Sequence, residues 1–177
     1  MLLLLAGGTG ERMGGGKPFA DVGGRPLWRW MADGLADAGL DVTVSVGSDP
    51  YDTTPYRCVI DPIPELGPLG GIAAVAGTDL TVWTVDVPDW TVEELDVLGR
   101  SDMDAVRFLI DDAHQPQPLL AHWPASATEQ VPAYLGAGGR AVLPFLDRVP
   151  NGPIGAPRRR THLTTKSDVD EWLRSRS

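Results

Sequence analysis

The chain has 177 residues, a length that favours one domain with room for a sizeable core. Its formal net charge of −9 argues against nucleic acid and anionic membrane as partners, because both repel an acidic protein. The single cysteine, Cys58, excludes an internal disulfide and fits a reducing cytoplasm, and its apolar neighbours predict a core position. We therefore expect one domain over residues 1–177, working in the cytoplasm.

The chain begins with an apolar run, residues 2–5, that leads directly into a glycine-rich loop. The run suits a short buried strand; it is too short to span a membrane and lacks the basic region and cleavage site of a secretory signal. The loop holds six glycines together with Arg12 and Lys17. A strand that enters such a loop brings backbone N–H groups close to phosphates, and the two cations add charge where a triphosphate would lie.

Two well-known phosphate loops do not fit this stretch. The Walker pattern fails because Glu11 takes the place of its first glycine and Pro18 follows Lys17. The dinucleotide pattern can start at Gly8 and Gly10 but then meets Met13 in place of its last glycine. The remaining readings are a nucleotide loop of another kind and a flexible glycine loop without a ligand.

Further along, strand-like and helix-like segments alternate. The expected strands after the first are residues 42–46, 57–61, 80–87, 104–110, 117–123 and, near the end, 160–164. The expected helices are residues 27–39, 68–76, one opened by a Thr91–Glu94 capping box, one opened by Ser126 and Glu129, residues 140–146, and one capped by Ser167 and Asp170. This alternation predicts an α/β fold with three α/β/α layers around a mostly parallel sheet.

In such folds ligands bind beyond the carboxyl ends of the strands, so the glycine loop, Asp61 and Asp86 should converge there. Asp86 ends an apolar strand, where a carboxylate is costly unless it is paired or metal-bound, and we expect it to be the Mg²⁺ ligand. Asp61 can accept hydrogen bonds from a ribose or a base. For both residues the alternative is a loop cap. The histidines show no metal-ligand spacing, and His122 fits a structural role.

Several segments, in order along the chain, carry a resemblance to a known family. They are the loop L-A-G-G-x-G-x-R-M-G-G-x-K, V-I-D at 59–61, L-G-P-L-G-G-I at 66–72, V-D-V-P at 85–88, Q-P-L at 117–119 and Y-L-G-A-G-G-R at 134–140. The loop resembles that of nucleotidyltransferases in general. Together the segments are similar to the molybdenum cofactor guanylyltransferases, which transfer GMP from GTP to molybdopterin and release pyrophosphate.

The resemblance implies a set of site residues. Lys17, Arg12 and Asp86 would carry the chemistry, with Mg²⁺ held by Asp86. The nucleotide would contact Leu5, Ala6, Gly7, Gly8, Gly10, Lys17, Ser45, Asp61 and Asp86. Ser45 stands where the family commonly has an asparagine. The implied partners are GTP, molybdopterin or Mo-molybdopterin, and a molybdenum-insertion enzyme in transient contact.

The end of the chain departs from the family pattern. The family usually has N-x-N before its final helix, but residues 164–168 read TTKSD, so the acceptor could differ. Lys166 can supply phosphate charge or lie in solvent. Arg140 is either an acceptor-phosphate residue or a surface arginine at a helix start. The run at 158–160 either attracts an anionic acceptor or is a solvated charge run. The alternatives are thus a nucleotidyltransferase for another acceptor, such as adenosylcobinamide phosphate, one that uses CTP, and a silent nucleotide-binding protein.

Overall fold

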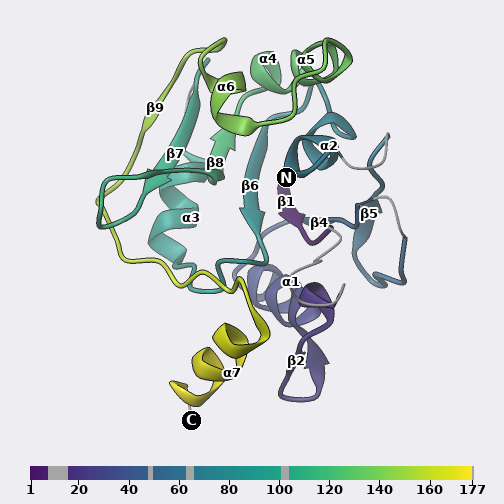
Figure 1. Cartoon of the computed structure of the whole chain (residues 1–177), viewed down its shortest axis with the longest axis vertical. Helices are drawn as coiled ribbons and strands as arrows, with labels where there is room; N and C mark the ends of the chain where they lie inside the picture. Colours follow the sequence, from purple (N-terminus) through teal and green to yellow (C-terminus); the bar gives the residue numbers. More distant parts are fainter. Residues whose placement is uncertain (8–15, 48–49, 63–65, 101–103, 177) are drawn as a thin grey trace.

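The structure is a computed structural model, and it describes residues 1–7, 16–47, 50–62, 66–100 and 104–176. Among these residues seven strands form one sheet in the order β5-β4-β1-β6-β8-β7-β9 (Figure 1). The strands are β1 (Leu2–Leu5), β4 (Val42–Ser45), β5 (Arg57–Val59), β6 (Leu80–Thr84), β7 (Val106–Ile110), β8 (Pro116–Trp123) and β9 (Asn151–Pro153). β8 runs antiparallel to β6 and β7, and the other neighbouring pairs are parallel. The prediction of a mostly parallel sheet is confirmed.

Helices cover both faces of this sheet. They are α1 (Leu27–Asp37), α2 (Pro68–Ala73), α3 (Val92–Gly99), α4 (Ala125–Thr128), α5 (Val131–Gly136), α6 (Val142–Leu146) and α7 (Lys166–Arg174). A short 3-10 turn, η2 (Lys17–Phe19), precedes a small hairpin of β2 (Asp21–Val22) and β3 (Arg25–Pro26). None of the described helices is long and apolar enough to cross a bilayer.

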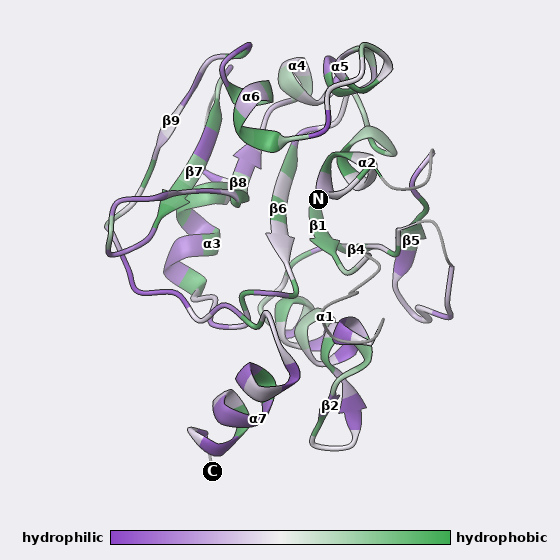
Figure 2. Ribbon diagram, viewed as in Figure 1, coloured by the Kyte–Doolittle hydropathy of each residue, from purple (hydrophilic) through white to green (hydrophobic). Residues whose placement is uncertain are grey.

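The four leucines of β1 show why the layers form. Side chains alternate across a strand, so Leu2 and Leu4 join the core beneath α1, α3 and α7, and Leu3 and Leu5 join the core beneath α2, α4, α5 and α6. The strand is buried on both faces, which explains an unbroken apolar run where alternation would mark a half-exposed strand (Figure 2). The three-layer α/β/α fold is confirmed.

Two predicted helix starts are wrong. Ser126 lies inside α4, which begins at Ala125, and a separate helix, α5, follows at Val131. α7 begins at Lys166 and is capped by Thr165 and Asp168 instead of Ser167 and Asp170. At α7, Thr165 and Asp168 have the same spacing as Ser167 and Asp170 and form the cap, whereas α4 follows Pro124 and has no side-chain cap. The Thr91–Glu94 capping box of α3 is confirmed.

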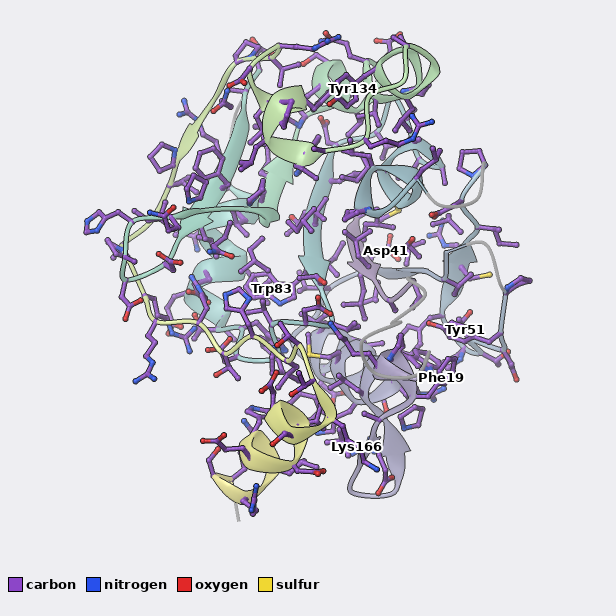
Figure 3. All side chains as sticks on the ribbon, in the orientation of Figure 1. Phe19, Asp41, Tyr51, Trp83, Tyr134 and Lys166 are labelled. Atoms are coloured by element: carbon purple, nitrogen blue, oxygen red, sulfur yellow. The ribbon has the colours of Figure 1, made fainter. Side chains whose placement is uncertain are left out.

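Two other predictions near the sheet edges also fail. Residues 160–164 form no strand, and the extra strand is β9, which pairs in parallel with β7 at the edge of the sheet. Cys58 is exposed instead of buried, because β5 is an edge strand at the other end of the sheet. Figure 3 shows Trp83 in the interior beside β6, and Phe19 next to Tyr51, whose ring centroid is 4.8 Å away.

Candidate active site at the carboxyl ends of β1, β4, β5 and β6

The backbone brings several predicted site residues together at one edge of the sheet. Ala6 N donates to Ser45 O at 2.9 Å, and Val85 N donates to Leu5 O at 3.2 Å. The end of β1 therefore lies between the end of β4 and the end of β6. This is the edge at which ligands bind in open α/β sheets.

Gly7 follows β1 at a point where the backbone of another segment comes very close. A Cβ added to Gly7 would lie 2.3 Å from Gly47 N, which is far inside contact distance. Since the obstacle is backbone, a side chain at residue 7 would separate the two loops. The glycine thus allows the loop after β1 to pass directly over the loop after β4.

Asp61 and Ser45 are held side by side by two glycines of α2. A Cβ at Gly70 would lie 2.4 Å from Asp61 Oδ2, and one at Gly71 would lie 2.3 Å from Ser45 Oγ. Burial raises the pKa of Asp61, and a hydrogen bond with the Ser45 side chain offsets part of that rise. The buried Oδ1 of Asp61 has no hydrogen-bond partner among the described residues. A ligand that donates to this oxygen would satisfy it.

Asp86 sits in a turn that a buried tryptophan fixes. The indole N–H of Trp83 donates to Val87 O at 2.7 Å, and Val87 N donates to Thr84 O at 3.2 Å. Asp86 N approaches Thr84 Oγ1 at 3.4 Å. Because Trp83 is fully buried, the turn is anchored in the core and holds the Asp86 side chain at the sheet edge.

Lys17 and Asp86 meet, although they are far apart in the sequence. Lys17 Nζ lies 3.1 Å from Asp86 Oδ1, and the two side chains are 17% and 41% exposed. η2 thus delivers the last cation of the glycine-rich stretch to the end of β6. The other predicted loop residues, Gly8, Gly10 and Arg12, lie outside the described residues.

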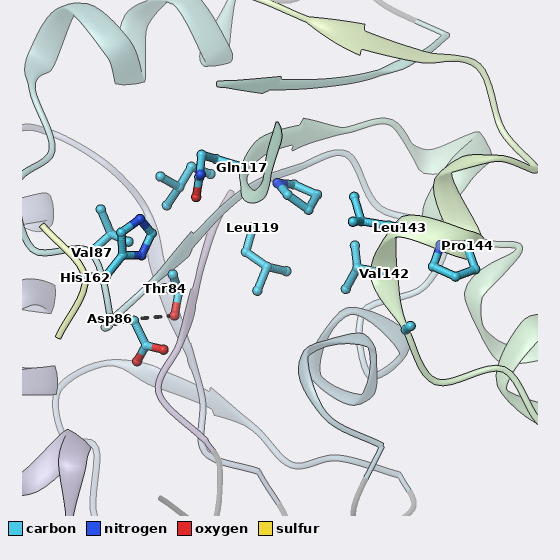
Figure 4. A pocket seen from close by; sticks show the side chains of 12 residues that line it. Thr84, Asp86, Val87, Gln117, Leu119, Val142, Leu143, Pro144 and His162 are labelled. Atoms are coloured by element: carbon cyan, nitrogen blue, oxygen red, sulfur yellow. Dashed lines mark hydrogen bonds between the residues drawn. The ribbon is translucent and has the colours of Figure 1, made fainter. Parts of the chain in front are cut away.

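A pocket of about 470 Å³ opens beside Asp86 (Figure 4). Its lining residues are Thr84, Asp86, Val87, Gln117, Pro118, Leu119, Leu120, Ala141, Val142, Leu143, Pro144 and His162. The polar groups Asp86, Thr84, Gln117 and His162 gather toward one end, and apolar side chains, including Leu143, line the other. The pocket suits a molecule with a polar group near Asp86 and an apolar surface toward Leu143.

The Y-L-G-A-G-G-R segment builds one side of this region through internal contacts. A Cβ at Gly139 would lie 2.3 Å from the Tyr134 ring, and Tyr134 OH donates to Ala141 O at 3.0 Å. Arg140 Nη1 donates to Leu135 O at 2.9 Å and to Gly139 O at 2.6 Å. In this structure, therefore, Arg140 is a local backbone tie near the pocket wall.

The basic run at 158–160 is not a solvated charge run. Arg160 has a fully buried side chain whose Nη2 lies 2.6 Å from Glu94 Oε1, and Arg158 Nη1 donates to Glu94 Oε2 at 2.9 Å. Only Arg159 is exposed among the three. Lys166 is exposed at the start of α7.

Sequence reasoning did not place His162 in the pocket. The run H-L-T-T carries no periodicity or spacing that connects it with Asp86, and His162 reaches the pocket only because Leu163 N donates to Asp86 O where the chain returns across the sheet edge. His122, by contrast, lies buried in β8, where burial lowers its pKa, as expected of a structural histidine.

Comparison with known proteins agrees with this arrangement. The family model of the MobA-like NTP transferase domain matches residues 2–149. The chain belongs to this family. It is 30% identical to a molybdenum cofactor guanylyltransferase of Cereibacter sphaeroides, over 95% of this chain and 91% of that protein. It is 28% identical to the protein of that name in Serratia proteamaculans, over 96% of this chain and 92% of the relative.

Solved structures share the fold of this MobA-like chain. Molybdopterin-guanine dinucleotide biosynthesis protein A from Archaeoglobus fulgidus superposes with a TM-score of 0.80 at 20% identity, covering 99% of both chains. A 2-C-methyl-D-erythritol 4-phosphate cytidylyltransferase from Thermus thermophilus gives 0.69 at 13% identity, covering 100% of this chain and 99% of that one. The MobA-like chain is therefore a nucleotidyltransferase in fold and family.

Proposed function

We propose that this protein is a magnesium-dependent guanylyltransferase that transfers GMP from GTP to molybdopterin or Mo-molybdopterin and releases pyrophosphate. The relatives named above support the donor and acceptor. The observation that carries the proposal is the Lys17–Asp86 pair, which lies between the Ser45–Asp61 region and the pocket. Lys17, which can bind phosphate, and Asp86, which can bind a metal ion, thus lie between the region that we assign to the nucleoside and the pocket that we assign to the acceptor.

The nucleoside half of GTP would bind at the ends of β1, β4 and β5. Asp61 Oδ1 is buried without a partner among the described residues, so it can accept from a base N–H or a ribose hydroxyl. Ser45 can take part through its hydroxyl, and Leu5 and Ala6 would form the floor. The loop that begins at Gly7 would donate backbone N–H groups, including those of Gly8 and Gly10, to the phosphates.

In the transfer step, an acceptor phosphate oxygen forms a bond to the α-phosphorus of GTP. The bond from that phosphorus to the oxygen bridging to the β-phosphate breaks, and pyrophosphate leaves with the electron pair. The chain has to hold both reactants in line and screen negative charge. Lys17 and Arg12 would do so on the triphosphate side.

Asp86 fits a Mg²⁺ ion that arrives with the nucleotide. Mg²⁺ commonly takes one or two carboxylates together with phosphate oxygens and waters. Asp86 offers an accessible carboxylate at the strand end, and the described residues contain no cluster of three or more His, Cys, Asp or Glu that could hold a metal. When bound there, Mg²⁺ would neutralise phosphate oxygens and stabilise the charge that develops on pyrophosphate.

We assign the pocket beside Asp86 to the acceptor. Its apolar end would pack against the flat pterin, and its polar end would receive the phosphate that attacks. We also treat residues 1–177 as a single domain, because Leu163, near the end of the chain, donates to Asp86 O. We propose the cytoplasm as its location, where a single unpaired cysteine stays reduced. Molybdopterin would arrive free or by transient contact with a molybdenum-insertion enzyme.

The test is nucleotide transfer with each donor and acceptor in turn. Purified protein with Mg²⁺ is incubated with each labelled triphosphate and with molybdopterin, Mo-molybdopterin, adenosylcobinamide phosphate or 2-C-methyl-D-erythritol 4-phosphate. We expect pyrophosphate and product with GTP and the pterin acceptors. Turnover with CTP, or with another acceptor alone, would instead support a related nucleotidyltransferase. GTP binding without transfer to any acceptor would support a silent nucleotide-binding protein.

A further inference from the structure

Residues 158–163, which we call the strap, lie beyond the stretch that the family model matches, yet they reach the centre of the site. Leu163 N donates to Asp86 O at 2.8 Å, and His162 lines the pocket beside Asp86. The strap therefore touches both the turn that carries the metal carboxylate and the wall of the acceptor pocket. Its position bears directly on the geometry of the site.

Glu94 of α3 ties the strap in place. Its Oε2 accepts from Thr91 N at 3.2 Å in the capping box and from Arg158 Nη1 at 2.9 Å, and its Oε1 pairs with Arg160 Nη2 at 2.6 Å. A second tie runs through Asp89, whose Oδ2 accepts from Thr161 N at 3.2 Å. One carboxylate at the start of α3 thus joins a helix, the strap and, through Leu163, the Asp86 turn.

The burial of Arg160 makes this tie costly to form. Its side chain is 0% exposed, and Nε and Nη1 have no hydrogen-bond partner among the described residues. The Nη2 contact is a close ion pair and not an aligned hydrogen bond. Burying a guanidinium with so few partners contributes little net stability, whereas a buried pair fixes one arrangement of the two segments it joins. The buried charge of Arg160 therefore serves to fix the position of the strap against Glu94 of α3.

We propose that Glu94 and Arg160 are positioning residues that hold the strap so that His162 faces the acceptor and Leu163 secures the Asp86 turn. The acceptor part of this inference rests on the proposed function. The imidazole of His162 then contacts the polar part of the acceptor at the Asp86 end of the pocket. The strap is expected to affect the acceptor side of the reaction more than the GTP side.

The experiment compares Glu94→Gln, Arg160→Met and Arg160→Lys with Arg159→Ala, the exposed neighbour, as the matched control. Glu94→Gln keeps the capping box, since glutamine also serves there, but removes the charge that both arginines share. We expect Glu94→Gln and Arg160→Met to raise the acceptor KM roughly ten- to a hundredfold, as misplaced supporting groups do. GTP KM should stay within about twofold, Arg160→Lys should recover part of the loss, and Arg159→Ala should match the wild type.

Two further readouts separate positioning from simple stabilisation. The effects of Arg160→Met and His162→Ala on acceptor KM should be less than additive, because both act on one contact. The Leu163 amide should exchange hydrogen faster in Glu94→Gln and Arg160→Met than in the wild type. A lowered Tm with unchanged acceptor KM, or an equal effect of Arg159→Ala, would overturn the proposal, and Glu94→Gln and Arg160→Lys serve if Arg160→Met does not fold.

Failure of the proposed function would look different. A wild-type protein that transfers no GMP to either pterin acceptor would refute the guanylyltransferase assignment. Faster Leu163 exchange in Glu94→Gln and Arg160→Met would then still support the positioning of the Asp86 turn. Unchanged exchange in both variants would refute the strap inference whatever the enzyme transfers.

Discussion

Gly70→Ala should weaken nucleotide binding without touching the nucleotide itself. The new Cβ would lie 2.4 Å from Asp61 Oδ2 and 2.8 Å from its Cγ, while ordinary contacts begin near 3.4 Å. The carboxylate must therefore retreat by about 1 Å, or α2 must move away from the end of β5. Either response displaces the buried acceptor that we assign to GTP.

The size of the effect follows from the two kinds of loss. Overpacking of this kind costs about 1–3 kcal/mol, which corresponds to about 2–12 °C in Tm for a chain of this length. Losing a hydrogen bond to a charged group costs about 1.5–3 kcal/mol, so GTP affinity should fall roughly ten- to a hundredfold. Calorimetric titration with GTP and a thermal melt measure the two quantities on the same preparation.

Gly136→Ala is the matched control, because a Cβ at Gly136 meets nothing within 4 Å at the end of α5. It should leave both GTP affinity and Tm near their wild-type values. If the loss in Gly70→Ala acts through Asp61, combining it with Asp61→Asn should weaken GTP binding little further. Unchanged GTP affinity in Gly70→Ala would refute the assignment of Asp61 to the nucleotide.

Asp86→Asn should lower transfer by about a hundredfold or more while the fold persists, and chelation of Mg²⁺ should stop the wild type; the exposed Asp96→Asn is the control, and unchanged turnover would remove Asp86 from the metal role. Lys17→Ala should weaken triphosphate binding about tenfold or more, measured by titration with GTP, and an unchanged affinity would count against its phosphate contact. Asp61→Asn should raise the Tm of the ligand-free protein at neutral pH, because burial raises the pKa of Asp61 in the folded protein above its ordinary value of 3.8 and the ionised carboxylate destabilises the fold. The gain in Tm should shrink as the pH falls from the folded pKa of Asp61 to below 3.8, where the carboxyl is protonated in both states. A gain in Tm that persists in acid would contradict this cause. The Thr164 hydroxyl and the backbone amides of residues 164 and 165 hold the pKa of Asp168 at about 2, so its contribution to α7 is present above pH 3.8 and is lost as the pH falls toward 2, which near-ultraviolet circular dichroism of the nearby tryptophans should report.

The fold was largely predictable because its signals are local. Residues 2–5 are apolar without alternation, which marks a strand covered on both faces, and Thr91 with Glu94 marks a helix start. The same kind of signal failed at Ser126, because α4 has no side-chain cap, and at Ser167, because Thr165 and Asp168 offer the same spacing two residues earlier. Burial of Cys58 was also mispredicted, because an apolar stretch does not reveal that its strand lies at the sheet edge.

In the candidate site, too, some residues could be predicted from local sequence signals and others could not. Asp61 and Asp86 were predicted to lie at one edge because each was expected to end a strand, and the structure places each of them two residues beyond a strand at that edge. Lys17 was proposed from its glycine-rich loop, but its 3.1 Å approach to Asp86 could be seen only from the three-dimensional path of η2. His162 and Arg160 could not be assigned, because His162 shares a pocket with Asp86 and Arg160 pairs with Glu94, and both partners lie far away in the sequence.

The exposed thiol on β5 gives this protein a built-in attachment point for a reporter group. Cys58 is the one cysteine in the sequence, so a maleimide dye or a nitroxide would attach at a single position without any substitution. β5 leads directly to Asp61, whose N–H donates to Gly47 O at 2.9 Å at the edge of the region that we propose for the nucleotide. A label there would lie three residues from Asp61, so that GTP binding at the proposed Asp61 site could be followed in real time and separately from transfer.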